Sequence, residues 1–421
     1  MKKLFITLFI CIFSPLPCFS EVVHVTLDEA VNLALTQNLD LQAKRQRLNE
    51  LEQDVKIANA LKNPQFQSNF LMGKVTRGNS SQFGAALPVE VAKRGVRKKA
   101  AQINLKIAQD EVRAAEHNLK IEVMRSYFNV LYMKSVVYVL QERERLFRNM
   151  QTISAQKTKS SSENIDVLQN NMKYEKQLVL LNQARGNLLG AQFALNDTMN
   201  VKGSQVMYDT VESSLFSSDL KMLDINLLPY QVIEDTAMKY SYSLSIAQEK
   251  INLSDVQVTM AERQRIPNIV LGGGYAYQTS QQTGHEALNG AYAALGFEIP
   301  VFYTYAPEIN KAKLVLERTN IEKSSYENHL KFALKEDYNR FKYAKENISH
   351  YKVILADSKK ILDKYKKRYE KGQSTWLNLI QVENAHQETL KEYINAVQVY
   401  YDSYLNLMQN VGHEVLIEED L

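Results

Sequence analysis

The sequence predicts a mostly α-helical protein with a transmembrane β part, in which long coiled-coil hairpins alternate with four β-strands per chain. Glycine and proline are sparse, at 15 and 8 in 421 residues, which favours long uninterrupted helices. Apolar residues follow a heptad spacing over long stretches, and two shorter regions switch to strict alternation. The net charge of +4 is too small to indicate a nucleic-acid partner.

The first twenty residues have the pattern of a secretory signal peptide. An apolar run from Leu4 to Phe13 follows two lysines, and small residues stand at Cys18 and Ser20. The run is too short to span a bilayer as a retained helix, so we expect cleavage after Ser20. Lipidation at Cys18 is the alternative, although Pro17 stands where a lipobox needs a small flexible residue. The mature chain would then have no cysteine for a disulfide, a thiolate metal site or a nucleophile.

The two halves of the mature chain align with each other. Residues 27–42 lie over residues 230–245 at an offset of 203, and residues 160–169 lie over residues 372–381 at an offset of 212. The halves therefore form two structural repeats. The expected division is a signal peptide over 1–20, a first repeat over 21–210 and a second repeat over 211–421.

Each repeat has the pattern of one helix, two strands, a long helix, a break and a second long helix. In the last helix, apolar residues recur at alternating steps of four and three, which is the heptad seam that packs one helix against another. These residues are Tyr393, Val397, Tyr400, Tyr404, Leu407 and Val411. Gly372 interrupts the second pair of helices, because glycine weakens a helix by about 1 kcal/mol relative to alanine. We predict helical hairpins over about 95–200 and 306–411.

Four segments have the alternating pattern of β-strands. Each has about ten residues and one apolar face, the length and pattern of transmembrane strands. The predicted strands span about 64–75 and 82–91 in the first repeat, and about 268–278 and 288–301 in the second. The stretch LGGGY at 271–275 lacks the spacing and following helix of a dinucleotide-binding loop, and we interpret it as a place of bending or close backbone approach.

Four strands cannot close a barrel by themselves. In lipid, the two edges of such a sheet would leave unpaired backbone groups, each costing several kcal/mol. The chain must therefore obtain strands from other copies. A cyclic homo-oligomer is the most economical solution, and three copies would give twelve strands.

With this organisation the chain resembles the TolC-like outer-membrane factors, the exit ducts of efflux and type I secretion systems. The resemblance covers nearly the whole mature chain. It depends on the order and duplicated spacing of TLDEAVNLALTQN, of NPQF and RIPNI before the strands, of LPV and IPV after them, and of both helix breaks. It implies a homotrimer with a twelve-stranded barrel in the outer membrane of a Gram-negative bacterium, continuous with a periplasmic α-barrel.

The same resemblance implies a passive channel with no enzymatic activity and no cofactor. Its implied partners are a periplasmic adaptor (membrane fusion) protein and an inner-membrane pump of the RND or another type. The segment LPVEVAKRGVRKKAAQ at 87–102 further resembles the heavy-metal cation-efflux branch (CzcC/CusC-like), with Val91 and Ala92 in place of its usual glycine pair. This favours metal cations over drugs or proteins as cargo. A periplasmic adaptor and an exported coiled-coil scaffold are the alternatives to a channel.

The resemblance also places a periplasmic aperture at the two helix breaks. The family has a Tyr and an Arg that tether the second hairpin, followed by two Asp at the narrowest point. Tyr369 matches the Tyr, whereas Ser374 stands at the Arg position, and Asn378 and Gln381 stand at the Asp positions. These departures argue against a strongly charged constriction. The predicted aperture residues are Asp166, Gln169, Tyr369, Gly372, Ser374, Asn378 and Gln381.

Other candidate residues have both a functional and a structural interpretation. The aperture residues could be ordinary turn-flanking polar residues. Trp376, the only tryptophan, could bind a partner or pack within its own hairpin. The basic run after the second strand could contact lipid phosphates or be a solvated helix start; it consists of Lys93, Arg94, Arg97, Lys98 and Lys99. No two of the seven histidines are three to five residues apart, so no metal site is predicted.

Overall fold

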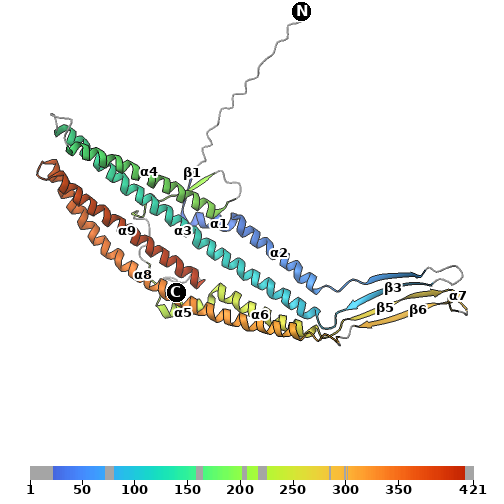
Figure 1. Cartoon of the computed structure of the whole chain (residues 1–421). Coiled ribbons are helices and arrows are strands. Elements are labelled where there is room, and N and C mark those ends of the chain that lie inside the picture. Colours follow the sequence, from blue (N-terminus) through green and yellow to red (C-terminus); the bar gives the residue numbers. More distant parts are fainter. Residues whose placement is uncertain are drawn as a thin grey trace, which may run out of the picture.

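The structure is a computed structural model, and it shows long helices that end in a projecting β-sheet (Figure 1). It describes residues 22–71, 80–157, 165–201, 206–216, 225–283, 286–297, 300 and 302–412. The predicted signal peptide and Cys18 lie outside these residues. No helix within the described ranges is both long enough and apolar enough to cross a membrane.

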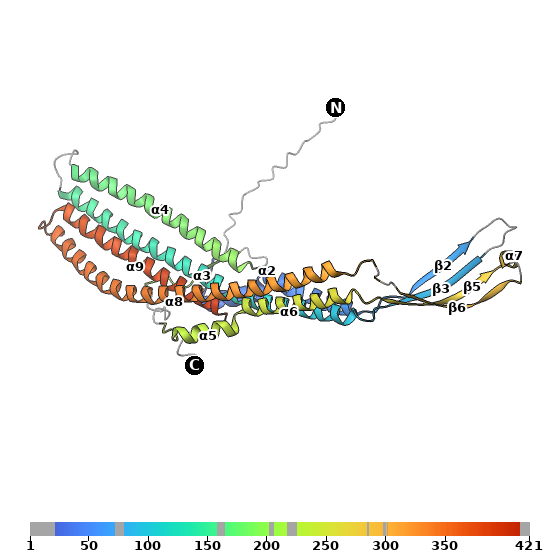
Figure 2. The ribbon, with the colours of Figure 1, turned by 60° about the horizontal axis from the view of Figure 1, so that its bottom comes forward.

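Four long helices form the body of the molecule. Helices α3 (Arg94–Lys157) and α4 (Ile165–Met199) form the first hairpin, and α8 (Ala306–Glu370) and α9 (Trp376–Val411) form the second. At 1.5 Å per residue, the 64 residues of α3 extend over roughly 96 Å. The two hairpins run side by side, and the end of α3, the start of α4 and the turn between α8 and α9 lie at the end farthest from the sheet (Figures 1 and 2).

Shorter helices accompany the sheet-proximal halves of α3 and α8. Where the sequence predicts one helix in each repeat, the structure has two: α1 (Leu27–Gln37) and α2 (Leu39–Asn59), then α5 (Tyr230–Tyr240) and α6 (Tyr242–Arg263). The prediction of a single helix is therefore wrong. Asn38 accounts for the first division, because its side chain accepts a hydrogen bond from Leu41 N and caps α2.

A two-stranded parallel pair lies against the middle of the first hairpin (Figure 1). It consists of β1 (Val22–Val25) and β4 (Met207–Thr210), which the sequence analysis did not predict. Lys134 of α3 holds it in place: its Nζ lies 3.1 Å from Asp209 Oδ1 and donates to Thr210 O at 2.8 Å. The pair thus ties the start of the described chain to the end of the first repeat.

The four predicted strands form one antiparallel sheet in the order β2-β3-β5-β6 (Figure 2). Their bounds are β2 Gln65–Leu71, β3 Ser80–Val89, β5 Ile269–Gln278 and β6 Leu288–Phe297, with the short helix α7 (Ser280–Thr283) between the last two. The central β3–β5 pairing joins the two repeats. The expected strand ends at 72–75, 298, 299 and 301 lie outside the described residues.

The main core lies between the two hairpins and the short helices. All six residues of the predicted heptad seam on α9 are buried, which confirms its packing role. Phe128 of α3 stacks on Tyr401 of α9 at 4.3 Å between ring centroids, and Phe341 of α8 lies 4.5 Å from Tyr400. Aromatic packing therefore fixes α9 between the first repeat and α8.

Candidate functional site: the sheet and the hairpin ends

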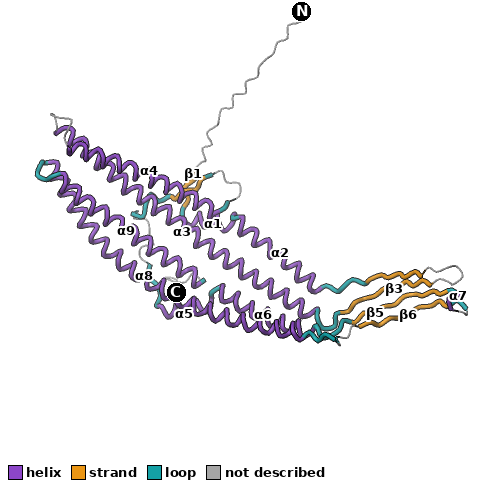
Figure 3. The backbone as a smooth tube through the Cα atoms, viewed as in Figure 1, coloured by secondary structure: helices purple, strands orange, loops and turns teal. Residues whose placement is uncertain are grey.

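One face of the four-stranded sheet is apolar and exposed. Phe83 pairs with Tyr275 and Leu87 pairs with Leu271, so alternate residues of β3 and β5 share this face. Phe66 remains 75% exposed. The large apolar side chains of the face are Phe66, Phe70, Phe83, Leu87, Leu271, Tyr275, Tyr277, Leu295 and Phe297. These side chains are exposed in the described structure, where the sheet projects beyond the helical bundle (Figure 3). An exposed apolar surface of this kind marks an interaction surface.

The opposite face of the sheet carries small and polar residues. Gly84 and Gly274 pair with each other across β3 and β5. A Cβ on Gly274 would overlap the carbonyl oxygen of Phe83, and a Cβ on Gly84 would overlap the hydroxyl of Tyr292. Close backbone approach therefore requires glycine here, which confirms the interpretation of LGGGY.

Both outer strands of the sheet have a free edge. Within the described part of the chain, β2 pairs with β3 alone and β6 with β5 alone. An open edge of about seven to ten residues presents a row of unpaired N–H and C=O groups that other strands can pair with. The sheet is therefore a fragment that further strands can complete.

The break between α8 and α9 is built by two local signals. Gly372 has φ +73°, its N–H donates to Tyr369 O at 3.0 Å, and Gln373 N–H donates to Arg368 O at 2.8 Å. These two bonds form a Schellman motif, which ends α8. Thr375 then caps α9 by accepting a hydrogen bond from Asn378 N.

The predicted aperture residues divide into buried and exposed groups. Tyr369 is only 8% exposed, and the Ser374 hydroxyl oxygen is buried without a hydrogen-bond partner in the described structure. Asn378 and Gln381 are exposed on the first turns of α9, and Gln169 is exposed on α4. Asp166 is the second residue of α4. The break between α3 and α4, at residues 158–164, lies outside the described residues.

The two hairpin ends pack against each other through a second hydrophobic cluster. Its buried members are Phe147, Met150, Leu362, Tyr369, Trp376, Leu379 and Ile380, from α3, α8 and α9. Trp376 is 8% exposed, and Lys173 Nζ of α4 lies 4.8 Å from its ring centroid. Of its two interpretations, the structure supports packing within the chain, because this side chain contacts both hairpins.

A buried ion pair lies next to this cluster. The Glu383 side chain of α9 is fully buried, and its Oε1 is 3.2 Å from Arg143 Nε of α3, without hydrogen-bond geometry. Burial raises the pKa of Glu383 and Arg143 opposes this rise. Arg143, Glu383 and His386 line one cavity of about 330 Å³, and burial lowers the pKa of His386. The Arg143–Glu383 pair was not predicted from the sequence. The heptad seam of α9, continued toward the start of the helix, nevertheless passes through Glu383 and His386.

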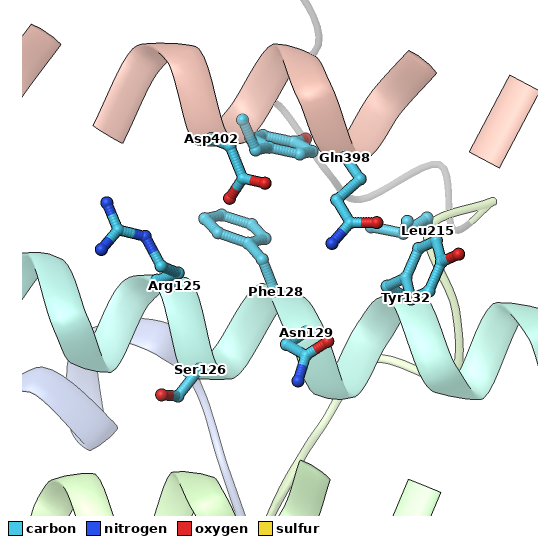
Figure 4. A pocket seen from close by; sticks show the side chains of 9 residues that line it. Arg125, Ser126, Phe128, Asn129, Tyr132, Leu215, Gln398 and Asp402 are labelled. Atoms are coloured by element: carbon cyan, nitrogen blue, oxygen red, sulfur yellow. The ribbon is translucent and has the colours of Figure 1, made fainter. Parts of the chain in front are cut away.

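A second cavity of about 320 Å³ lies between α3 and α9, near the middle of α3 (Figure 4). Arg125 and Asp402 point into it from opposite helices, beside Phe128 and Gln398. Burial raises the pKa of Asp402 and the Arg125 guanidinium opposes this rise. Across the described residues, no three His, Cys, Asp or Glu side chains converge as metal ligands.

The basic run after β3 is partly used by the structure itself. Arg94 Nε donates to Asn59 O at 2.7 Å and Arg97 Nε donates to Ala58 O at 3.0 Å, so both arginines satisfy carbonyls at the end of α2. Arg97 also pairs with Glu90 at 2.7 Å. These two arginines are half-buried and bonded within the chain, a role that neither interpretation included. Lipid contact remains a prediction for the three lysines.

Known structures share this architecture. The chain matches no protein-family model and no curated protein sequence. It is similar to the crystal structure of CusC, with TM-score 0.73 and 17% identity over 92% of this chain and 91% of that chain. For the Campylobacter jejuni CmeC outer membrane channel the TM-score is 0.72 and the identity 16%, over 92% of this chain and 85% of that chain. For the Neisseria gonorrhoeae MtrE outer membrane channel the TM-score is 0.73 and the identity 15%, over 93% of this chain and 89% of that chain. The TolC-like fold predicted from the sequence is therefore confirmed.

Proposed function

We propose that this protein is the outer-membrane exit duct of a tripartite efflux system, a passive channel without catalytic chemistry. The observation that carries the proposal is the amphipathic sheet with two free edges, projecting from helices of roughly 96 Å. The apolar face suits lipid and the small, polar face suits a water-filled lumen. The fold supports this reading, since its solved examples include outer membrane channels.

The proposal requires a homotrimer. Three four-stranded sheets would close a barrel of twelve strands and remove both free edges. The barrel would lie in the outer membrane of a Gram-negative bacterium, and the hairpins would extend into the periplasm. Their ends would meet a periplasmic adaptor protein, which connects the duct to an inner-membrane pump.

Heavy-metal cations are the proposed cargo, and the resemblance of residues 87–102 supports them. Two residues of this segment also stabilise the fold, because Arg94 and Arg97 donate hydrogen bonds to carbonyl groups at the end of α2. The alternatives are a drug or protein cargo. Deletion of the gene, followed by challenge with metals, dyes and detergents, tests the cargo: sensitivity confined to metals supports cation export, and sensitivity to dyes or detergents alone contradicts it.

The duct itself is tested by fractionation and cross-linking. We expect the mature protein to need detergent for extraction and to run as a trimer. Residues 21–421 contain no cysteine, so Gln381→Cys should cross-link protomers and lower transport if this residue lines the aperture. Gln42→Cys, exposed on α2, is the matched control. A water-soluble monomer would refute the channel, whereas a trimer that does not cross-link would remove Gln381 from the aperture.

A further inference from the structure

The last turns of α8 carry a stripe of four lysines that the proposed function has not used. The stripe consists of Lys360, Lys364, Lys367 and Lys371, all exposed. Their spacing of four, three and four places them on one side of the helix. The stripe is about 16 Å long at 1.5 Å per residue. It ends at the hairpin tip, far from the sheet (Figure 2).

The stripe faces away from the core of its own chain. Leu362 and Tyr369 mark the buried side of this part of α8, where they contact α3 and α9. At about 100° per residue, the four lysines lie roughly 140–200° around the helix from Leu362. They are therefore available to a second molecule.

The charge of this region is strongly one-sided. Between residues 352 and 371 there are eight lysines and arginines and three acidic residues, a net charge of 8 − 3 = +5, compared with +4 for the entire chain. Lys360 makes an exposed pair with Asp357 at 3.0 Å. The side chains of the other three lysines of the stripe make no ion pair or hydrogen bond within the described structure.

Helix stability does not explain the stripe. Basic residues stabilise the C-terminal turn through the helix dipole, which accounts for Lys367 and Lys371. That effect falls off within one turn, so it does not extend to Lys360 and Lys364. Like charges at this spacing also destabilise a helix. The lysines therefore have a cost within the chain that an external partner would remove.

In a second copy of the chain, the described end of the first hairpin does not offer the complementary charge. Within residues 142–157 and 165–176, the described end of the first hairpin, there are six basic and four acidic residues, a net charge of 6 − 4 = +2. We propose that the lysine stripe docks an acidic helix of a periplasmic partner protein, with carboxylates at the matching spacing of four, three and four. The proposal rests on the proposed function only because that function places the hairpin ends in the periplasm.

A synthetic helical peptide with four glutamates at this spacing is the probe, and a peptide of equal composition with the glutamates distributed around the helix is its control. Binding to the full-length protein in detergent is followed by fluorescence anisotropy at 50 and 300 mM NaCl. We expect the matched peptide to bind at least tenfold more tightly than its control at low salt, and to weaken at high salt. Equal binding of the two peptides, or none, would overturn the proposal.

Variants separate the stripe from general charge. Replacing all four stripe lysines with glutamate should weaken binding of the matched peptide at least tenfold. Glu at four other exposed α8 lysines should leave binding within twofold; these are Lys311, Lys313, Lys335 and Lys342. Circular dichroism and the emission of Trp376 verify folding, and four glutamines at the stripe provide a milder second variant. If both sets of four glutamate substitutions weaken peptide binding equally, the stripe is not a specific docking site.

In cells, the stripe variant should form trimers in the outer membrane but lose export, whereas the control quartet should keep it. Wild-type export by the stripe variant would refute the docking proposal and leave the channel intact. If deletion of the whole gene causes no sensitivity to any exported compound, the proposed function fails, while the peptide measurements still decide the stripe.

Discussion

Replacing Arg143 with methionine should destabilise the hairpin ends by an amount that depends on pH. Glu383 is fully buried and Arg143 is its ion-pair partner, 3.2 Å away, whereas Lys366 and Lys173 act on it more weakly. Without Arg143 the buried carboxylate has two costly choices. It can stay ionised, and removing one partner of a buried ion pair typically costs about 3–5 kcal/mol. Alternatively, it can take up a proton.

Protonation sets an upper limit on the loss. For a glutamate of unfolded pKa about 4.3, taking up a proton at pH 7 costs about 3.7 kcal/mol, at 1.36 kcal/mol per pH unit. At pH 5 the same limit is about 1 kcal/mol. The sign follows from linkage: a raised pKa means that the folded state holds more protons, so stability falls as pH rises above the unfolded value. The variant should therefore approach the wild type on acidification.

Trp376 provides the measurement. It is the only tryptophan and lies buried in the cluster beside the pair, so its emission reports opening of this end of the molecule. Denaturant titrations of wild type and variant at pH 5 and pH 7 give the difference in unfolding free energy. His386 faces the same cavity and titrates in both proteins, so its contribution largely cancels in the difference.

Two further variants complete the design. Arg145→Met removes an exposed pair with Glu142 and should cost less than about 1 kcal/mol at either pH. Glu383→Gln removes the buried charge and should abolish most of the pH dependence of the unfolding free energy. If Arg143→Met is equally destabilising at pH 5 and pH 7, or if it matches Arg145→Met, the reasoning from burial is wrong.

Three smaller predictions concern the backbone. Gly274→Ala should prevent the β3–β5 pairing and lower trimer yield, because its Cβ would overlap the carbonyl of Phe83; Gly290→Ala, which meets no atom, should leave the yield unchanged. Gly372→Ala should cost about 1–2 kcal/mol, since its φ is +73°, and the Trp376 assay would show no change if the turn tolerates a side chain. Thr375→Ala should cost about 1 kcal/mol and Thr375→Ser should restore it; equal stability of both would exclude the cap.

Sequence periodicity predicted those parts of the fold that are amphipathic over several turns. The heptad seam of α9 and the alternation in β5 are such patterns, and both occur where expected. The parallel pair of β1 and β4 escaped prediction because four residues are too few to show a period. The helix division at Asn38 escaped because it depends on one capping side chain.

The buried charges are a different kind of omission. Continued backward from Tyr393 in steps of three and four, the α9 seam passes through Leu390, His386, Glu383 and Leu379. A charged residue in a core position is the signal, since such residues are almost never buried unpaired. Its partner Arg143 lies 240 residues away on another helix, and spacing along one helix does not identify such a residue. The predicted aperture residues would depend on neighbouring chains in the same way.

The buried pair also limits how the hairpins can separate. Glu383 lies seven residues after Trp376, so about two turns of α9 lie between the pair and the break. Breaking one such pair costs about 3–5 kcal/mol, whereas one partner typically couples to a conformational change by about 1–3 kcal/mol. A single contact is therefore too weak to separate α3 from α9 at this level. Several contacts acting together could do so, and a four-lysine stripe on each chain of a trimer would allow that.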